Sequence, residues 1–299
     1  MSEEQTAYDG PSMGIGLHYD VPMERYLADP CERPSLSKGA MHDLIYRTPA
    51  HTWWNNKRLN PYAPDDESAR ADLGSAVHAA ILGGKPLMFF AADDWRTKAA
   101  QEWRKGVRET GGIPLLEKNK EDVEGAAAAG KALLQTLPGG PFEWQREGTM
   151  VWESDGVLKR GRFDLFCEEA NTMVDVKTCT SANPSAWIRT SLSSGGYDLQ
   201  AEHYLEGIRR LVPALPEGTQ FLFLLCELEA PYGCSFVGLD PAFSEFARRK
   251  MEFAVKLWKE CLASDQWPSY SVYPHWAELR PWDEAELEMK MVYAKEVTS

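Results

Sequence analysis

The 299-residue sequence lacks several features that would point to familiar classes of protein. None of its six cysteines forms a C-x-x-C pair, which argues against a zinc ribbon and against an iron–sulfur cluster. No apolar run is long enough to span a membrane, and no internal repeat or low-complexity segment is evident. Scattered cysteines and the lack of a signal peptide suit a reducing compartment, so we expect a cytoplasmic protein with buried or free thiols.

Positive charge is also scarce. The chain has 32 Lys and Arg residues against 45 Asp and Glu residues, a formal net charge of −13. This balance favours solubility and, taken alone, argues against a general polyanion binder. Nucleic acid remains a possible partner, because a local basic lining can lie inside an acidic protein.

The first half of the chain has the pattern of helices. Ser37 is a candidate N-cap for a helix that carries Leu44 and Ile45 on its apolar face. In the segment ARADLGSAVHAAILGG, Leu73 and Val77 lie on one helical face, and paired glycines end the helix. Two more amphipathic helices are predicted at about 93–109 and 118–136.

The pattern changes to strands at Thr149. The segments TMVWE, LKRGRFDLF and TMVDVKT predict three strands, joined by the turns SDG and EEAN into a meander. A helix is expected over about 197–212, then the strands QFLFLLCEL and CSFVGL, and then a helix over about 241–263. This order predicts an α/β (α+β) sheet with helical cover and an N-terminal helical elaboration.

Two carboxylates stand out inside the apolar strands. Asp175 and Lys177 are two residues apart, so their side chains share one face of the third strand. Asp164 lies in the second strand, one short turn away, so neighbouring antiparallel strands would bring the two aspartates together. Buried carboxylates repel each other unless a cation lies between them, and oxygen ligands suit Mg²⁺ or Mn²⁺. The competing interpretation is a structural ion pair between Asp175 and Lys177, with Asp164 as an ordinary acid at a strand edge.

Two helices offer surroundings for this pair. Gln200 and Tyr204 are four residues apart and lie on one helical face, which suits positioning groups as well as an ordinary polar stripe. His78 lies on the helix of residues 69–84, one turn after Gly74. A single histidine on a helix is more often a buried or boundary residue than a ligand.

Taken in order, these motifs resemble those of the RecE-type (exonuclease VIII) branch of the PD-(D/E)-x-K nucleases, a group of phage and prophage recombination exonucleases. The resemblance covers roughly residues 17–283. It includes the segments LGSAVHAAIL, GVLKRGRFDLF, MVDVKTCTSANPSAW and YDLQAEHYLEGI. It implies a restriction-endonuclease-like core, in which helices flank a central mixed sheet.

The resemblance also implies roles for individual residues. The catalytic set would be His78, Asp164, Asp175, Lys177, Gln200 and Tyr204. Within it, His78, Asp164 and Asp175 would bind catalytic Mg²⁺ or Mn²⁺ with help from the Val176 carbonyl. Lys177 would orient or activate the attacking water. A further acid assists the metal in related nucleases, and both Glu147 and Glu153 are candidates here.

Contacts to DNA are expected close to this set. Arg160 and Arg162 lie on the second predicted strand and are candidates for phosphate contacts. Ser35, Ser37 and Lys38 could hold a terminal 5′-phosphate at a helix N-terminus, although simple helix capping would explain them equally well. The helix of residues 93–109 is basic in part, but its acidic residues favour a solvated face.

As a function, the resemblance implies cleavage of linear double-stranded DNA from 5′ to 3′, which leaves 3′ single strands for a single-strand annealing protein. It further implies a ring-shaped homo-oligomer in a bacterial or phage-infected cell, without a membrane partner. The alternatives are a structure-specific or single-strand endonuclease on the same metal site and a non-catalytic DNA-binding assembly subunit.

The domain organisation expected from these patterns is simple. Residues 1–16 would be loose, and 17–299 would form a single nuclease domain. Within that domain we expect three parts: a mainly helical part at 17–146, a catalytic α/β core at 147–270 and a C-terminal tail at 271–299.

Overall fold

A computed structural model describes residues 11–64 and 71–298 of the chain. Most of the segment predicted to be loose, 1–16, therefore lies outside the described residues. The chain divides into a larger unit that ends at Pro268 and a smaller unit, Ser269–Ser299. We describe each unit by itself.

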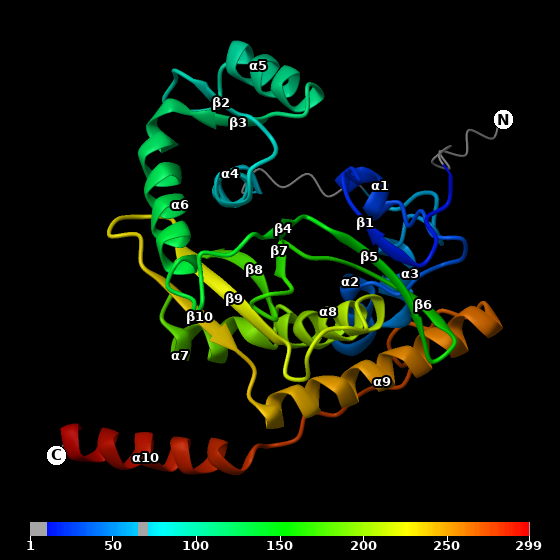
Figure 1. Cartoon of the computed structure of the whole chain (residues 1–299). Coiled ribbons are helices and arrows are strands. Elements are labelled where there is room, and N and C mark those ends of the chain that lie inside the picture. Colours follow the sequence, from blue (N-terminus) through cyan, green and yellow to red (C-terminus); the bar gives the residue numbers. More distant parts are fainter. Residues whose placement is uncertain (1–10, 65–70, 299) are drawn as a thin grey trace. The chain divides into compact units, whose positions relative to one another are not determined.

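The centre of the larger unit is a mixed sheet of five strands (Figure 1). Its order is β10 (Cys234–Gly238), β9 (Gln220–Glu227), β8 (Thr172–Cys179), β7 (Leu165–Cys167) and β4 (Gln145–Arg146). Strands β8 and β9 are parallel, whereas the other neighbours are antiparallel. The first five residues of β8 are buried, as in a strand that is covered on both faces.

Helices cover both faces of this sheet. On one face, Val174 and Val176 pack with helices α4 (Ala71–Leu82) and α6 (Lys120–Leu134). On the other face, Met173 packs beneath α8 (Tyr197–Leu211), close to α7 (Pro184–Trp187) and the following turn η2 (Ile188–Leu192). The expected alternation of side chains along residues 172–178 is therefore confirmed, and the face that carries Met173 also carries Asp175 and Lys177.

The expected three-stranded meander over residues 149–178 does not form, because its strands belong to two different sheets. Strands β5 (Thr149–Ser154) and β6 (Val157–Arg162) form an antiparallel sheet with β1 (Gly16–His18). The chain leaves this sheet at Phe163 and Asp164 before β7 begins. The Phe163 ring is buried at Gly148, where a Cβ atom would lie only 2.2 Å from it. The Asp164 carboxylate accepts a hydrogen bond from the backbone N–H of Val176, as described below.

Two short N-terminal helices, α2 (Lys38–Tyr46) and α3 (Pro49–Asn55), pack beside the long helix α9 (Pro241–Ser264), and α2 also contacts α8. Helix α1 (Met23–Leu27) precedes them, and its Tyr26 packs with Val151 and Leu158 of β5 and β6. Met41 of α2 shares a core with Leu199 and Trp258. The prediction that Ser37 caps a helix is confirmed, because its side chain accepts a hydrogen bond from Ala40 N at 3.3 Å.

An insertion separates α4 from α6 and projects at the top of Figure 1. It consists of β2 (Leu87–Phe90), α5 (Lys98–Glu109), β3 (Ile113–Leu116) and the turn η1 (Glu117–Asn119), with β2 and β3 paired in parallel. The rings of Phe90, Trp95 and Trp103 pack together inside it.

The smaller unit contains helix α10 (Pro281–Thr298), within the segment expected to be a tail. Several of its large apolar side chains are exposed, among them Tyr273, Trp276 and Trp282. Among the described residues, no helix is both long and apolar enough to cross a membrane.

Candidate active site

Asp164 and Asp175 meet where β7 lies against β8. The register pairs Leu165 with Val174, so Asp164 lies just before β7 and opposite Asp175. Asp164 Oδ2 accepts a hydrogen bond of 2.7 Å from the backbone N–H of Val176. The expected approach of the two aspartates from neighbouring strands is therefore present in the structure.

His78 reaches the same place from helix α4. Its Nε2 lies 2.9 Å from Asp164 Oδ1. Helix α4 can approach β8 closely because Gly74 faces Thr178, and a Cβ atom at Gly74 would lie 2.9 Å from Thr178 Oγ1. The small residue one turn before His78 thus allows the histidine to reach the carboxylate.

Asp175 is held by residues from its own strand and from α8. Gln200 Nε2 donates a hydrogen bond of 2.5 Å to Asp175 Oδ1. Lys177 Nζ lies 2.7 Å from Asp175 Oδ2, but Oδ2 is buried and accepts no aligned hydrogen bond. One carboxylate oxygen is therefore fully engaged, whereas the other has only a charged neighbour.

Tyr204 lies one turn after Gln200 and is buried. It packs against Gly161 of β6, where a Cβ atom would lie 2.8 Å from the Tyr204 ring. Burial raises the pKa of Tyr204 well above its usual value, and the charges of Asp175 and Asp164 add to the rise. Tyr204 therefore acts as a neutral group beside the two carboxylates.

The charges of the site are strongly coupled. Burial raises the pKa of Asp175 to about 6, and Asp164 adds to the rise while Lys177 opposes it. Burial also disfavours the charged form of Asp164, but the hydrogen bond and charge of His78, together with Lys177 and the Val176 N–H, outweigh it, so the pKa of Asp164 lies below its usual value. For Lys177, burial opposes the charge, yet Asp175 and Asp164 raise its pKa. His78 likewise has a raised pKa, because Asp164 outweighs the effect of burial.

The donor set suits a divalent cation. In an octahedral Mg²⁺ site with bonds of about 2.0–2.1 Å, neighbouring ligand atoms are about 3 Å apart. The 2.9 Å between His78 Nε2 and Asp164 Oδ1 matches this spacing. Asp175 Oδ2 supplies a buried oxygen that lacks an aligned donor. Among the described residues, no three His, Cys, Asp or Glu side chains already converge as a complete metal site. The described residues therefore offer ligand types that suit a divalent cation, without a preformed cluster.

Of the two candidate assisting acids, only Glu147 lies beside the aspartates. Its backbone N–H donates to Asp164 O at 2.9 Å, and its charge raises the pKa of His78. Glu147 also has a left-handed backbone with φ of 50°, which is uncommon for a residue other than glycine and is found at functional sites. Glu153 instead pairs with Arg33 at 2.8 Å, and both side chains are exposed.

Lys38, at the start of α2, lies near β8, the strand that carries Asp175 and Lys177. Its Nζ donates a hydrogen bond of 2.6 Å to Gly195 O. Burial, with repulsion from Lys177, lowers the pKa of Lys38 to about 8. Beside it is a cleft of about 710 Å³ whose lining includes Ser37, Lys38, His42 and Arg47. A partly buried ammonium group next to an open cleft is suited to bind an anion.

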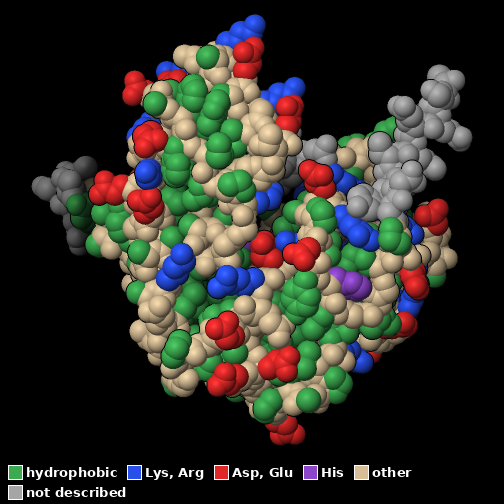
Figure 2. Space-filling model, turned by 45° about the horizontal axis from the view of Figure 1, so that its top comes forward, with side chains coloured by type: hydrophobic (Ala, Val, Ile, Leu, Met, Phe, Trp, Pro, Cys, Tyr) green, Lys and Arg blue, Asp and Glu red, His purple; other side chains and the backbone are tan. Residues whose placement is uncertain are grey.

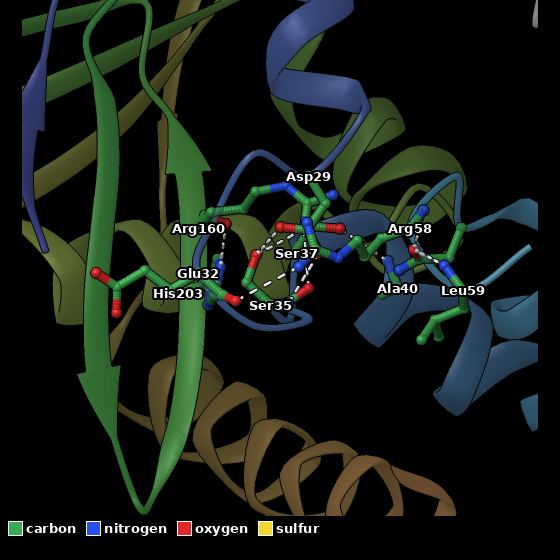
Figure 3. Close-up of polar contacts among 10 residues, drawn as sticks. Asp29, Glu32, Ser35, Ser37, Ala40, Arg58, Leu59, Arg160 and His203 are labelled. Atoms are coloured by element: carbon green, nitrogen blue, oxygen red, sulfur yellow. Dashed lines mark hydrogen bonds and ion pairs between the residues drawn. The ribbon is translucent and has the colours of Figure 1, made fainter. Parts of the chain in front are cut away.

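Ser35 and Arg160 are placed differently from the other predicted DNA contacts. Figure 3 shows them pointing toward each other and toward Asp29. Arg160 donates to Ser35 O at 2.8 Å and to Ser35 Oγ at 2.7 Å, and it pairs with Asp29 at 3.0 Å. Because both side chains are buried in this network, the structure favours a packing role for them over a phosphate contact.

Arg162 lies closer to the two aspartates than Ser35 and Arg160 do, because it contacts Glu147. It pairs with Glu147 at 3.2 Å and donates to Val21 O. On the face shown in Figure 2, Lys and Arg side chains are scattered among Asp and Glu and do not form one large basic area.

One residue near the site was missed in the sequence. Tyr197, the first residue of α8, has its ring centroid 4.7 Å from Lys177 Nζ. Its position three residues before Gln200, at a helix start that follows two glycines, was the available signal.

Comparisons with known proteins agree with this fold. A family model described as a PDDEXK-like domain of unknown function (DUF3799) matches residues 56–273. A solved structure described as a "putative exonuclease" from Eubacterium rectale is 14% identical, with a TM-score of 0.59. That likeness covers 90% of this chain and 98% of the other. The predicted fold class is confirmed by the family match and by this likeness in fold.

Two further solved structures have lower scores. An alkaline exonuclease from Laribacter hongkongensis is 13% identical with a TM-score of 0.29, over 66% of this chain and 94% of its own. A phage related exonuclease from Haemophilus somnus 129PT is 13% identical with a TM-score of 0.28, over 64% of this chain and 95% of its own. No curated protein sequence matches the chain significantly.

Proposed function

Because the chain belongs to the family of PDDEXK-like domains, we propose that it is a metal-dependent deoxyribonuclease that degrades linear double-stranded DNA from an end. The observation that carries the proposal is the meeting of Asp164 and Asp175, with His78 at 2.9 Å from one and Lys177 at 2.7 Å from the other. The Eubacterium rectale protein of similar fold is described as a "putative exonuclease", which favours the same reaction class.

The roles of the residues follow from their chemistry. His78, Asp164 and Asp175 would hold Mg²⁺ or Mn²⁺ with help from the Val176 carbonyl, and Glu147 would assist from beside them. When bound, such an ion neutralises phosphate charge and lowers the pKa of a bound water. Lys177 provides a fixed positive charge for the phosphate and a donor that orients the attacking water.

Gln200 and Tyr204 support this arrangement from α8. Gln200 fixes the orientation of the Asp175 carboxylate through its hydrogen bond to Oδ1, which leaves Oδ2 for a cation. The buried Tyr204 phenol stays neutral and packs against Gly161 of β6.

We assign the cleft beside Lys38 to the DNA end. Ser37 and Lys38 would bind a terminal 5′-phosphate there, with Arg162 as a contact nearer to the catalytic set. A phosphate held at a fixed place beside the carboxylates defines which bond is cut, and this favours digestion from 5′ to 3′. By resemblance to the RecE-type enzymes, we further propose a ring-shaped homo-oligomer that leaves 3′ single strands for an annealing protein in recombination.

End-labelled DNA tests the proposal. Purified protein with Mg²⁺ is given linear duplexes with a 5′-phosphate, a 5′-hydroxyl or blocked ends, and closed circles of the same sequence. We expect linear duplexes to be degraded, fastest from the 5′-phosphate, and closed circles to be spared. Cutting of circles at a comparable rate would favour an endonuclease, and absence of cleavage with every substrate would contradict a nuclease.

A further inference from the structure

The aromatic ring of Tyr197 lies at the centre of a small stack beside the catalytic strand. It stacks on Trp187 with centroids 5.3 Å apart and an interplanar angle of 9°. Phe223 of β9 contacts both rings, at 5.7 Å from Tyr197 and 5.3 Å from Trp187. Trp187 is buried, so the position of the Tyr197 ring is set by the core.

Two lysines from distant parts of the chain contact this ring. Lys177 Nζ lies 4.7 Å from the ring centroid, and Lys38 Nζ lies 5.0 Å from the same centroid. Ammonium groups within about 6 Å of an aromatic ring are attracted by its quadrupole, most strongly where water is excluded. The two nitrogens can be no further apart than the sum of these distances, so both ammonium groups lie in one small region.

The carboxylates and carbonyls that contact the two lysines do not by themselves fix the direction of both ammonium groups, and the Tyr197 ring adds a contact to each. Lys177 has a flexible side chain, and its contact with Asp175 Oδ2 is not an aligned hydrogen bond. Lys38 has the carbonyl of Gly195 as its acceptor. Two nearby ammonium groups repel each other, so neither contact alone keeps both directed toward the same region.

We propose that Tyr197 is a positioning residue for both cations: its ring, fixed against Trp187, holds Lys177 at Asp175 and Lys38 at Gly195, so that both face one DNA strand. The inference rests on the proposed nuclease function only for the identity of the anion. The positioning itself is a property of the protein alone.

The loop before α8 is shaped for this contact. A Cβ atom at Gly195 would lie 2.6 Å from the Tyr197 ring. Gly196 has a φ of +61° and would meet His42 in the same way, at 2.6 Å. His42 Nε2 donates to Ser194 O at 2.9 Å, next to the bond from Lys38 to Gly195. Helix α2 is thereby joined to the loop that begins α8, which brings Lys38 to the ring.

The positioning is measured first without DNA. Protein labelled with ¹³C at the lysine ε-carbon is compared as wild type, Tyr197→Phe and Tyr197→Leu, with signals assigned from Lys38→Met and Lys177→Met. We expect ring-current-shifted signals for both lysines in the wild type and in Tyr197→Phe, and their loss in Tyr197→Leu. Phe89→Leu is the matched control, because it removes a ring of β2 whose centroid lies 5.6 Å from Nζ of Lys120 in α6.

Kinetics on 5′-phosphorylated duplex gives the second readout. Tyr197→Leu should lower kcat about 10-fold, while Tyr197→Phe and Phe89→Leu should stay within about 2-fold of the wild type, since a phenyl ring keeps the cation–π contact. Lys38→Met should raise KM more than it lowers kcat, because Lys38 binds DNA without touching the reacting atoms.

Two results would overturn the inference. One is a lysine spectrum that does not change in Tyr197→Leu, and the other is equal kcat for Tyr197→Leu and Tyr197→Phe. A wild type that does not cut DNA at all would refute the proposed function and leave the spectra to decide the positioning.

Discussion

Two buried aspartates in this protein have opposite surroundings. Asp29 uses both carboxylate oxygens: Oδ2 accepts from Ser35 N at 2.8 Å and pairs with Arg160, and Oδ1 accepts from Ser35 Oγ at 2.7 Å. Asp175 is as deeply buried, but only its Oδ1 accepts an aligned bond. A buried charge is costly unless it is partnered, and the partners of Asp175 are Gln200 at Oδ1 and Lys177 at Oδ2.

The difference separates a structural ion pair from a candidate metal ligand. The Asp29 network joins the N-terminal segment to β6 and leaves no carboxylate oxygen for a ligand. Asp175 Oδ2 faces Lys177 Nζ at 2.7 Å, and Asp164 lies opposite Asp175. The competing interpretation of Asp175 and Lys177 as a plain ion pair accounts for their contact and treats the neighbouring Asp164 as an ordinary acid.

The strongest contrast is expected from neutralising Asp175. Asp175→Asn keeps the size of the side chain but removes the charge that would bind a cation, so cleavage of linear duplex should fall by about 1,000-fold or more. At neutral pH the free energy of unfolding should stay the same or rise, because the raised pKa of Asp175 means that folding opposes the ionised form of this side chain. Initial rates and urea unfolding measure the two quantities. A variant with more than a tenth of the wild-type rate would contradict the role of Asp175.

Breaking the Asp29 network should have the reverse effect. Arg160→Met leaves Asp29 buried without its ion-pair partner, which costs about 3–5 kcal/mol of unfolding free energy. The fraction that stays folded at low temperature should cut DNA within about 3-fold of the wild-type rate. Arg162→Met is the matched comparison. If Arg160→Met were stable yet inactive, Arg160 would be a DNA contact after all.

The two candidate assisting acids give a smaller contrast. Glu147→Gln should lower the cleavage rate about 10-fold, since an acid next to the metal ligands contributes charge but is not itself a main ligand. Glu153→Gln should change the rate by less than about 2-fold, because Glu153 forms an exposed pair with Arg33. Rates at several Mg²⁺ concentrations test this, and equal effects of both substitutions would contradict the assignment of Glu147.

The smallest effect is expected at His203, which is buried beside Arg160. Burial, with repulsion from Lys159, lowers the pKa of His203 to about 3, and its Nδ1 is buried without a partner. In the unfolded chain, His203 takes up a proton near pH 6.5, whereas in the folded protein it stays neutral down to about pH 3. The free energy of unfolding is therefore unaffected by this group above pH 6.5, and it falls as the pH falls from 6.5 toward 3. Between pH 6.5 and 5, wild type should lose about 1–2 kcal/mol more stability than His203→Gln. Parallel losses would show that His203 does not titrate in this way.

Part of this picture was predictable from the sequence because it depends on local periodicity. Residues two apart in β8 share a face, so Asp175 and Lys177 were placed together, and a short turn brought Asp164 close. The four-residue spacing of Gln200 and Tyr204 placed both on the face of α8 that lies toward the carboxylates. These features need only the geometry of a strand, a turn and a helix.

The remaining features depend on contacts between distant segments. The break at Phe163 comes from burial of its ring at Gly148, which no strand pattern reveals. Ser35 and Arg160 looked like phosphate contacts because the sequence does not show that Asp29 engages both. The approach of Lys38 to Lys177 results from the packing of α2 on the loop before α8, far away along the chain.

Manganese binding tests the central claim most directly. Mn²⁺ is titrated into DNA-free wild type, Asp175→Asn and Arg160→Met, and the bound ion is counted by electron paramagnetic resonance. The account predicts at least one bound Mn²⁺ in wild type and in folded Arg160→Met, and an affinity at least about 10-fold lower in Asp175→Asn. Equal Mn²⁺ binding by wild type and Asp175→Asn would contradict the assignment of the unaligned carboxylate oxygen to a metal site.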